Sequence, residues 1–471
     1  MLLVFAGRLA QFTIAFLSIK LMTTLLTPVE VGKIALITTA TAFFALFLVN
    51  PVGMFINRRL HGWVTTGLMK HYFHLYCGYL MGVAAIAALL TWALLQSHLW
   101  DMDLSPVWCA TLIAGSLVFN TINQTLVPSM NMLDRTRSFV FFTIFTLIVG
   151  LIVSIVLVKW LGANAVAWLA GPMISQLAFS LLAYKVFFRD GQNESRSLEG
   201  ADYRRLFNFA WPISLAVGLN WLHMQGYRFV LADSFGLAEL GLFSAGYGLA
   251  SSLTTACESV TTTWFQPRFY RDANSAEASV RAQAWGHYAS TMLPFTILAS
   301  SGIFMTAPYL TTIMLGPSYH TAVSYVMMGA LAEWGRTIFN IFALDAHGSM
   351  NTRRLIVPSL IGMTIAYAAM IVLINMRMLV AVPLAVLAGC VVMSAAIRLR
   401  ASHTAVPGEV DWRRVVMTAA GAVGVCLVFE LCRQHLLPAF GRFEPYGALL
   451  VALGLWGGSS WILLRLRGSV A

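Results

Sequence analysis

The sequence predicts an all-α polytopic membrane protein with about fourteen transmembrane helices. Three observations support this fold class. Hydrophobic residues make up 59% of the 471-residue chain and charged residues only 10%, whereas soluble domains carry about 25% charged residues. Apolar segments of about 20 residues, the length that crosses a bilayer core, follow one another along the whole chain. The loops between them alternate between rich and poor in Lys and Arg, which is the charge pattern of a multi-pass topology.

The predicted segments are bounded by polar turns or by Gly and Pro. They cover residues 2–26, 32–56, 73–96, 107–132, 138–158, 162–187, 206–233, 239–265, 285–315, 321–346, 355–375, 379–397, 415–432 and 446–464. Basic loops remain in the cytoplasm, so an even number of spans places both termini there. The first segment continues to the turn at Thr27-Pro28 without a cleavage site, and we interpret it as an uncleaved helix.

The net charge of +11 follows from this topology. Arg58, Arg59 and Lys70 share one loop, the next loop is acidic, and Arg135 and Arg137 occupy the loop after that. Nucleic acid is therefore not an expected partner. The six Cys are scattered through helices, no His pair has metal spacing, and there is no Walker loop. We expect no metal and no cofactor.

Two turns resemble each other and indicate an internal duplication. Glu30-Val-Gly32 follows the first segment, and Glu239-Leu-Gly241 follows the seventh. In both, Gly permits a tight turn and Glu lies favourably at a helix N-terminus. Convergent turn chemistry is the alternative explanation. Duplication predicts an N-terminal six-helix half (1–188), a cytoplasmic linker (189–205), a pseudo-symmetric six-helix half (206–400) and two additional helices forming a C-terminal hairpin (401–471).

Four stretches resemble bacterial polysaccharide-unit flippases, the Wzx-type O-antigen and exopolysaccharide transporters. These belong to the multidrug/oligosaccharidyl-lipid/polysaccharide exporter superfamily. The stretches are LLTPVEVG (25–32), YRFVLADSFGLAELGLFSAGY (227–247), FQPR (265–268) and LGPSYHTA (315–322). The similarity covers residues 1–400 in order, and its motifs specify the family better than the cargo.

The resemblance implies translocation of a polyprenyl-pyrophosphate-linked oligosaccharide repeat unit across the bacterial inner membrane by alternating access, for O-antigen or exopolysaccharide assembly. The expected partners are that substrate, membrane lipids, a coupling H⁺ or Na⁺, and a polysaccharide polymerase or glycosyltransferases. A cation-coupled drug or metabolite antiporter of the same superfamily is the alternative. A membrane enzyme is not expected, because no extracytoplasmic loop is long enough to hold a catalytic site.

Ionisable residues at membrane depth are costly and are the first candidates for function. Four bases are candidates for a cationic cavity that binds pyrophosphate: Arg8, Lys20, Arg228 and Arg336. Three acids are candidates for coupling or ion pairing: Glu258, Glu333 and Asp345. Glu333 and Arg336 are three residues apart on one helix, so we expect them to pair. Local ion pairing and snorkelling to the interface are the alternative explanation for all seven.

Polar groups in mid-helix extend this hypothesis to the sugar. The candidates for sugar contact are Asn120, Asn123, Gln124, Asn220 and His223, whose alternative role is helix–helix hydrogen bonding. Asn50-Pro51 interrupts the second segment, where Pro removes a backbone donor and frees a carbonyl. We expect a helix break there.

Overall fold

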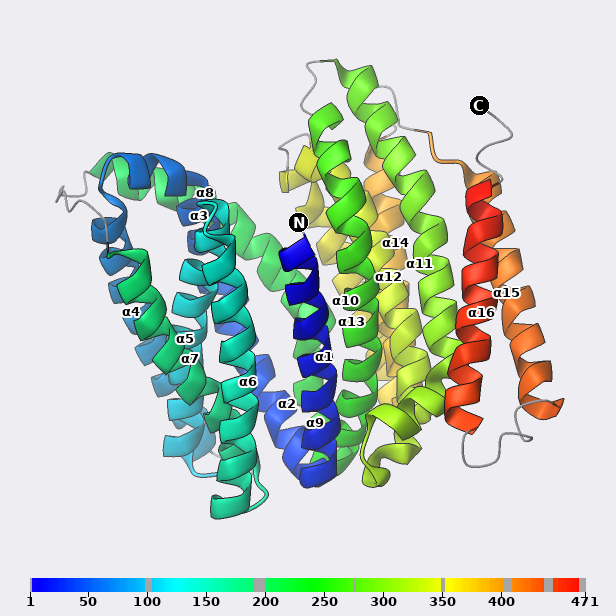
Figure 1. Cartoon of the computed structure of the whole chain (residues 1–471), viewed down its shortest axis with the longest axis horizontal. Helices are drawn as coiled ribbons and strands as arrows, with labels where there is room; N and C mark the ends of the chain where they lie inside the picture. The colour runs from blue at the N-terminus through cyan, green and yellow to red at the C-terminus, as the bar shows by residue number, and fades with distance from the viewer. Residues whose placement is uncertain are drawn as a thin grey trace. The chain divides into compact units, whose positions relative to one another are not determined.

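A computed structural model describes residues 2–97, 104–189, 200–273, 277–348, 352–401, 409–435 and 444–465. Throughout these residues the chain is helical apart from turns, which confirms the predicted all-α polytopic architecture (Figure 1). Most of the predicted linker and parts of the C-terminal region lie outside the described residues. Contacts divide the chain into two compact units, Met1–Gly241 and Leu242–Ala471. The predicted division into pseudo-symmetric halves around residues 189–205 stays a prediction.

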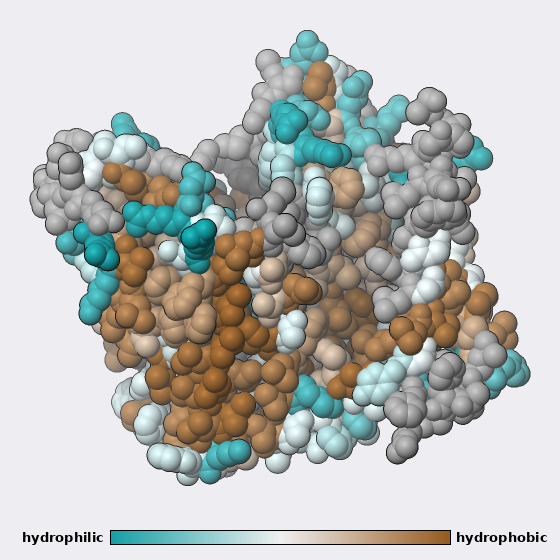
Figure 2. Space-filling model, viewed as in Figure 1, coloured by the Kyte–Doolittle hydropathy of each residue, from teal (hydrophilic) through white to brown (hydrophobic). Residues whose placement is uncertain are grey.

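Unit 1 contains the elements that correspond to the first seven predicted segments. They are α1 (Leu2–Leu25), α2 (Pro28–Phe44), η1 (Ala45–Val49), α3 (Asn50–Thr65), α4 (Met69–Gln96), α5 (Pro106–Met132), α6 (Thr136–Leu161), α7 (Ala165–Phe187), α8 (Gly200–Trp221), η2 (Leu222–Gly226) and α9 (Tyr227–Phe235). Figure 2 shows a hydrophobic belt on this unit between hydrophilic ends, as expected of helices that cross a bilayer.

Helix α10 (Leu237–Ala273) begins in unit 1 and continues into unit 2. The remaining elements of unit 2 are α11 (Ala278–Met314), η3 (Pro317–Ala322), α12 (Val323–Gly348), η4 (Thr352–Leu355), α13 (Ile356–Asn375), η5 (Leu379–Ala381), α14 (Val382–Ala401), α15 (Trp412–His435) and α16 (Glu444–Arg465). Each predicted segment therefore coincides with one helix or with a run of abutting helices.

Nine helical stretches among the described residues are long and apolar enough to cross a membrane by length and composition alone. Helices α1, α8, α10 and α12 are not among them. These four carry many of the polar and ionisable residues singled out above. The chain is a multi-pass membrane protein.

The second predicted segment continues as a helix through Asn50 and Pro51, and a π-helical turn precedes them in place of the predicted break. Five residues, Ala45–Val49, form a π-helical turn immediately before Asn50 and Pro51. Tyr79 of α4 donates its hydroxyl hydrogen to the carbonyl oxygen of Leu48 in this turn at 2.9 Å. A side chain from a neighbouring helix thus satisfies a carbonyl of the irregular turn, the usual condition for a non-α turn at membrane depth.

The two Glu-x-Gly stretches lie in the first turns of α2 and α10, so the expectation that their glycines serve tight turns is wrong. They pack on each other within unit 1. A Cβ added to Gly32 would collide with the carbonyl oxygen of Leu237, and one added to Gly241 would collide with that of Pro28. This close backbone approach explains why both positions are glycine, and the duplication stays a prediction.

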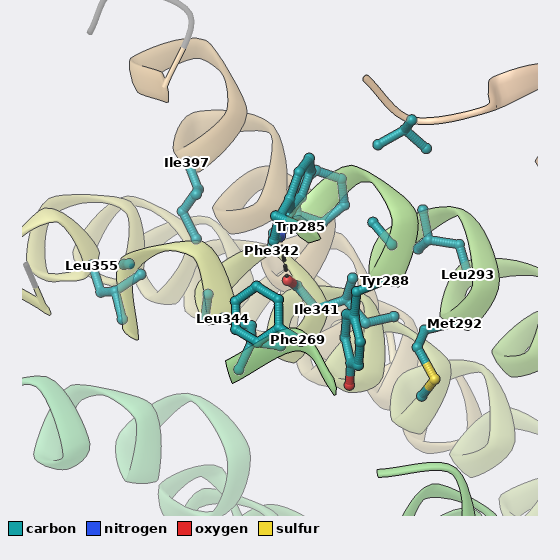
Figure 3. Packing of buried hydrophobic residues seen from close by; sticks show 14 residues of the cluster. Phe269, Trp285, Tyr288, Met292, Leu293, Ile341, Phe342, Leu344, Leu355 and Ile397 are labelled. Atoms are coloured by element: carbon teal, nitrogen blue, oxygen red, sulfur yellow. Dashed lines mark hydrogen bonds between the residues drawn. The ribbon is translucent and has the colours of Figure 1, made fainter. Parts of the chain in front are cut away.

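Unit 2 has a dense aromatic core at the end where α10 finishes and α11 begins (Figure 3). Phe269, Trp285, Tyr288 and Phe342 are buried there, and the Trp285 indole donates to the carbonyl of Ile341 at 3.0 Å. The bulk of this cluster fixes α10, α11 and α12 against one another, which positions the charged residues that α10 and α12 carry.

The C-terminal hairpin docks on α11. The carbonyl of Glu409 lies so close to Gly286 that no Cβ fits between them, and the Asp411 N–H donates to Ser290 Oγ at 2.9 Å. Farther along, Tyr309 donates its hydroxyl hydrogen to Glu444 of α16 at 3.1 Å. The two additional helices are therefore an integral part of unit 2.

Candidate functional site

A polar pocket of about 300 Å³ lies within unit 1 between α1, α5, α6 and α7. Its lining is rich in amides and contains one guanidinium. The polar lining residues are Arg8, Gln11, Asn120, Asn123, Gln124, Asn131, Thr143, Thr146 and Gln176. We call this the amide pocket. It reaches the last two residues of α5, next to the basic loop that the topology places in the cytoplasm.

Several polar groups of this lining make few hydrogen bonds within the protein and can therefore bind a ligand. Arg8 Nη1 donates to Gln11 Oε1 at 3.1 Å, and Gln176 Nε2 donates to Asn120 Oδ1 at 3.2 Å. Asn123 is 7% exposed, and its Nδ2 has no hydrogen-bond partner. An unsatisfied buried donor costs about 1–3 kcal/mol, so its presence indicates either an ordered water or a ligand. Amides offer both donors and acceptors, which matches the hydroxyl groups of a sugar.

The amide pocket brings together four of the residues that the sequence predicts. Arg8 is predicted for phosphate, and Asn120, Asn123 and Gln124 are predicted for sugar. Lys20 and Arg228 do not belong to its lining. Their assignment to a common cationic cavity with Arg8 and Arg336 stays a prediction.

Five polar lining residues were absent from the sequence-based set, and three of them are amides. Gln11 is one turn from Arg8 and Asn131 two turns from Gln124, so helical periodicity would have found both. Gln176 comes from α7, and only the packing of α7 on α5 brings it to Asn120. No periodic signal in the sequence connects those two helices.

The second polar centre is an ion cluster in unit 2. Arg336 Nε lies 2.6 Å from Glu333 Oε2, and its Nη2 lies 2.9 Å from Glu258 Oε2. Asn340 Nδ2 donates to Glu258 Oε1 at 3.2 Å. The predicted pairing of Glu333 with Arg336 is confirmed, and the structure adds Glu258 from α10 and Asn340 from α12. We call these four residues the ion cluster.

The ion cluster has an uneven charge balance. Two carboxyl groups face one guanidinium, and with both of them ionised the four side chains would carry one excess negative charge. Glu333 is 2% exposed, and burial disfavours an unbalanced charge. Binding one proton or one monovalent cation would neutralise the cluster. Arg336 already uses two of its nitrogens on carboxylates, which offset its charge, so it would attract phosphate less than a guanidinium without carboxylate partners.

The remaining candidates lie at separate places. Arg228 of α9 donates from Nη1 to Thr39 Oγ1 at 3.4 Å, within unit 1. His223 is fully buried in the π-helical turn η2, and Asn220 is half-buried just before it. Asp345 is half-buried near the end of α12. Within unit 1, neither Asn220 nor His223 lines the amide pocket, so their role in sugar contact stays a prediction.

Comparison with known protein families identifies the family to which this chain belongs. The profile of a family described as polysaccharide biosynthesis protein matches residues 21–324, which is more than half of the chain. The chain belongs to the polysaccharide biosynthesis protein family. The matched region contains every residue of the amide pocket except Arg8 and Gln11, and it ends at the start of α12. No functionally curated protein sequence matches this member of the family.

Solved structures identify the fold of this family member. It is similar to the lipid II flippase MurJ in an inward closed conformation, with a TM-score of 0.67, 13% identity and coverage of 98% of each chain. It is also similar to an inward-facing multidrug resistance MATE transporter of the MOP superfamily, with a TM-score of 0.55, 13% identity and coverage of 83% of this chain and 94% of the transporter. A MOP superfamily transporter from Pyrococcus furiosus matches with a TM-score of 0.53, 13% identity and coverage of 84% and 93%. The fold is therefore that of the MurJ and MATE transporters.

Proposed function

We propose that this protein moves a polyprenyl-diphosphate-linked oligosaccharide repeat unit across the bacterial inner membrane by alternating access. One observation carries the proposal: a chain of the polysaccharide biosynthesis family with a transporter fold holds an amide-lined pocket beside a guanidinium. Sugar hydroxyl groups lose their water when they enter a membrane, and amides replace those hydrogen bonds. Arg8 would meet the diphosphate first, because guanidinium forms forked hydrogen bonds with phosphate oxygens.

In this mechanism the lipid tail stays in the bilayer while the head group crosses inside the protein. The uncharged lining of the amide pocket suits the saccharide, and one cation suits the phosphate end. The protein would act without covalent chemistry and would deliver its cargo to a polymerase. Glycosyltransferases would supply the cargo on the cytoplasmic side, where both termini of this protein are proposed to lie.

The ion cluster is our candidate for energy coupling. Its excess negative charge would be neutralised by H⁺ or Na⁺, and Arg336 would change partners as Glu258 gains or loses that charge. A two-state salt bridge of this kind can bias a conformational equilibrium by its differential stability in the two states. Glu258 is the exchanging carboxylate in this scheme, because it is more exposed than Glu333.

The second candidate function is cation-coupled antiport of a drug or metabolite. The same excess negative charge favours it, because an organic cation would also neutralise the ion cluster. The amide pocket discriminates between the two functions, since a sugar would use its amides and a hydrophobic cation would not.

Complementation of a strain that lacks the gene tests the proposal. The proposal expects loss of surface polysaccharide and accumulation of the lipid-linked repeat unit on the cytoplasmic side, both reversed by the intact gene. Gln176→Leu and Asn123→Leu should restore export only in part, at normal membrane abundance. Normal polysaccharide in the deletion strain together with new sensitivity to organic cations would contradict the proposal and support antiport.

A further inference from the structure

A second cavity in unit 1 has a different chemistry from the amide pocket. It has a volume of about 310 Å³ and lies between α3, α4 and α8. Its lining is mainly aromatic and aliphatic, with two guanidinium groups. The lining residues are Val52, Phe55, Ile56, Arg59, Trp63, Tyr72, Leu75, Tyr76, Tyr79, Arg205 and Leu206. We call it the aromatic groove, and none of these residues lines the amide pocket.

The aromatic wall is preorganised. The rings of Trp63 and Tyr72 stack with centroids 4.2 Å apart and planes 18° apart. Phe55 contacts Trp63 edge-on at 6.3 Å, so the wall continues along α3. Tyr79 is fixed at the other end by its hydrogen bond to the carbonyl of Leu48. Tyr79 is 39% exposed, so its ring is accessible from outside the protein. Together the rings form an apolar surface against which a flexible hydrocarbon chain can pack.

The charges of the groove have one sign. Arg59 and Arg205 are both exposed, and the lining residues that the structure describes include no carboxylate. The Arg59 guanidinium carbon lies 5.8 Å from the centre of the Phe55 ring, so this cation is held over the aromatic wall. Two cations beside an apolar surface complement a ligand that has a phosphate and a hydrocarbon chain.

The position of the groove along the helices agrees with this chemistry. It extends from Tyr79, beside the π-helical turn, toward the start of α4 at Met69 and Lys70, the side that the predicted topology places in the cytoplasm. Figure 1 shows α3 and α8 close together at one end of α4. The apolar wall would thus lie at acyl-chain depth and the guanidinium groups at the level of the phosphates, where Arg, Trp and Tyr are favoured.

We infer that the aromatic groove is a binding site for an anionic membrane phospholipid. Arg59 and Arg205 hold its phosphate, and one acyl chain lies along Trp63, Tyr72 and Tyr79. Phospholipid is always present at this depth of the membrane. The two arginines attract an anionic headgroup more strongly than a zwitterionic headgroup, whose own positive charge they repel. The described lining of the groove offers no amide to bind a saccharide, which favours a phospholipid over the lipid-linked sugar as its ligand. The bound lipid connects α3 to α4 and α8 and stabilises the segment that contains the π-helical turn.

Native mass spectrometry of the full-length protein in nonionic detergent tests this inference. The probes are phosphatidylglycerol and phosphatidylcholine with the same acyl chains, polyprenyl monophosphate, and free glycerol phosphate. We expect at least one phosphatidylglycerol to bind about tenfold more tightly than phosphatidylcholine, with no retention of glycerol phosphate. The double variant R59Q/R205Q should lose this preference, and R59K/R205K should keep most of it.

Arg137→Gln is the matched control, because Arg137 is an exposed base at the same predicted side of the membrane and does not line the groove. It should bind phosphatidylglycerol as the unaltered protein does. The thermal midpoints of all variants without lipid should agree, since Arg59 and Arg205 are exposed. Equal binding by R59Q/R205Q and R137Q would overturn the inference. Displacement of phosphatidylglycerol by polyprenyl monophosphate at a lower concentration than that of phosphatidylglycerol would also overturn it. That result would assign the groove to the isoprenoid lipid. Polysaccharide export is not a readout here, so the inference can fail independently of the proposed function.

Discussion

The amide pocket and the ion cluster each contain an arginine within a helix, and the two arginines are in opposite situations. Arg8 contacts one neutral amide, lines a cavity and is exposed. Arg336 is held by two carboxylates, and its side chain is 23% exposed. A guanidinium inside a membrane protein is therefore not by itself evidence of an anion site. Its partners determine whether it is available to a ligand or already neutralised by the protein.

The two sites also differ in which buried group raises the free energy of the folded protein. In the amide pocket the unfavourable group is a neutral donor on Asn123, which a ligand or water can satisfy. In the ion cluster it is an excess carboxylate charge, which only a proton or cation can satisfy. The first suits recognition of a substrate and the second suits coupling. Four variants can break or sharpen this comparison.

The largest effect is expected for Arg336→Ala. It leaves Glu333, which is almost completely buried, and Glu258 without their shared cation. Removing one member of a buried ion pair costs about 3–5 kcal/mol, so export and membrane abundance should fall together. Arg336→Lys should recover part of both, since an ammonium lacks the fork that reaches two carboxylates. Abundance and thermal midpoint are measured by fluorescence-detected size-exclusion chromatography. Normal abundance with lost export would instead place Arg336 in direct contact with the substrate.

Arg8→Ala should have the opposite profile. The exposed contact of Arg8 with Gln11 stabilises the fold by less than about 1 kcal/mol, so abundance should stay normal. Export should fall about tenfold, which corresponds to about 1.4 kcal/mol of lost substrate binding. Arg137→Ala is the control for a general loss of positive charge. Full export by the Arg8 variant would remove it from the proposed substrate path.

Asn123→Leu should stabilise the protein while it impairs export. An apolar side chain of similar size removes a buried donor without a partner, which should raise the free energy of unfolding by about 1 kcal/mol. Export should fall several-fold, because a saccharide loses a hydrogen-bonding group. Ser129→Ala, whose hydroxyl bonds to the carbonyl of Thr125 on its own helix, is the control for altered polarity in α5. A destabilised Asn123 variant would mean that the amide has a structural partner.

The smallest effect is expected for Asn340→Ala. Its amide donates to Glu258 at 3.2 Å from an exposed position, so its loss should cost less than about 1 kcal/mol. If Glu258 is the exchanging carboxylate, export should still fall by about twofold, because Glu258 keeps only its contact with Arg336. Export and membrane abundance measured together check this. Unchanged export at equal abundance would count against Glu258 as the coupling group.

The sequence by itself determined the helices and the local neighbours. Apolar length and loop charge predicted every helical segment, since a bilayer forces the chain to satisfy its backbone within each segment. The spacing of three residues predicted the Glu333–Arg336 pair, and Pro51 predicted an irregularity in the second segment, where a π-helical turn lies just before Asn50. These features depend on residues within one or two helical turns, and such distances are readable from a single sequence.

Tertiary structure alone decided which helices share a site. Gln176 reaches Asn120, and Glu258 reaches Arg336, only because α7 packs on α5 and α10 lies beside α12. Helix faces in a membrane lack the strong polar–apolar contrast that orients helices in water, so the sequence leaves their rotation open. Close contacts fix it instead, such as those at Gly32 and Gly241, where a missing Cβ lets backbones meet. The same packing leaves Arg8 available to a ligand and pairs Arg336 with two carboxylates.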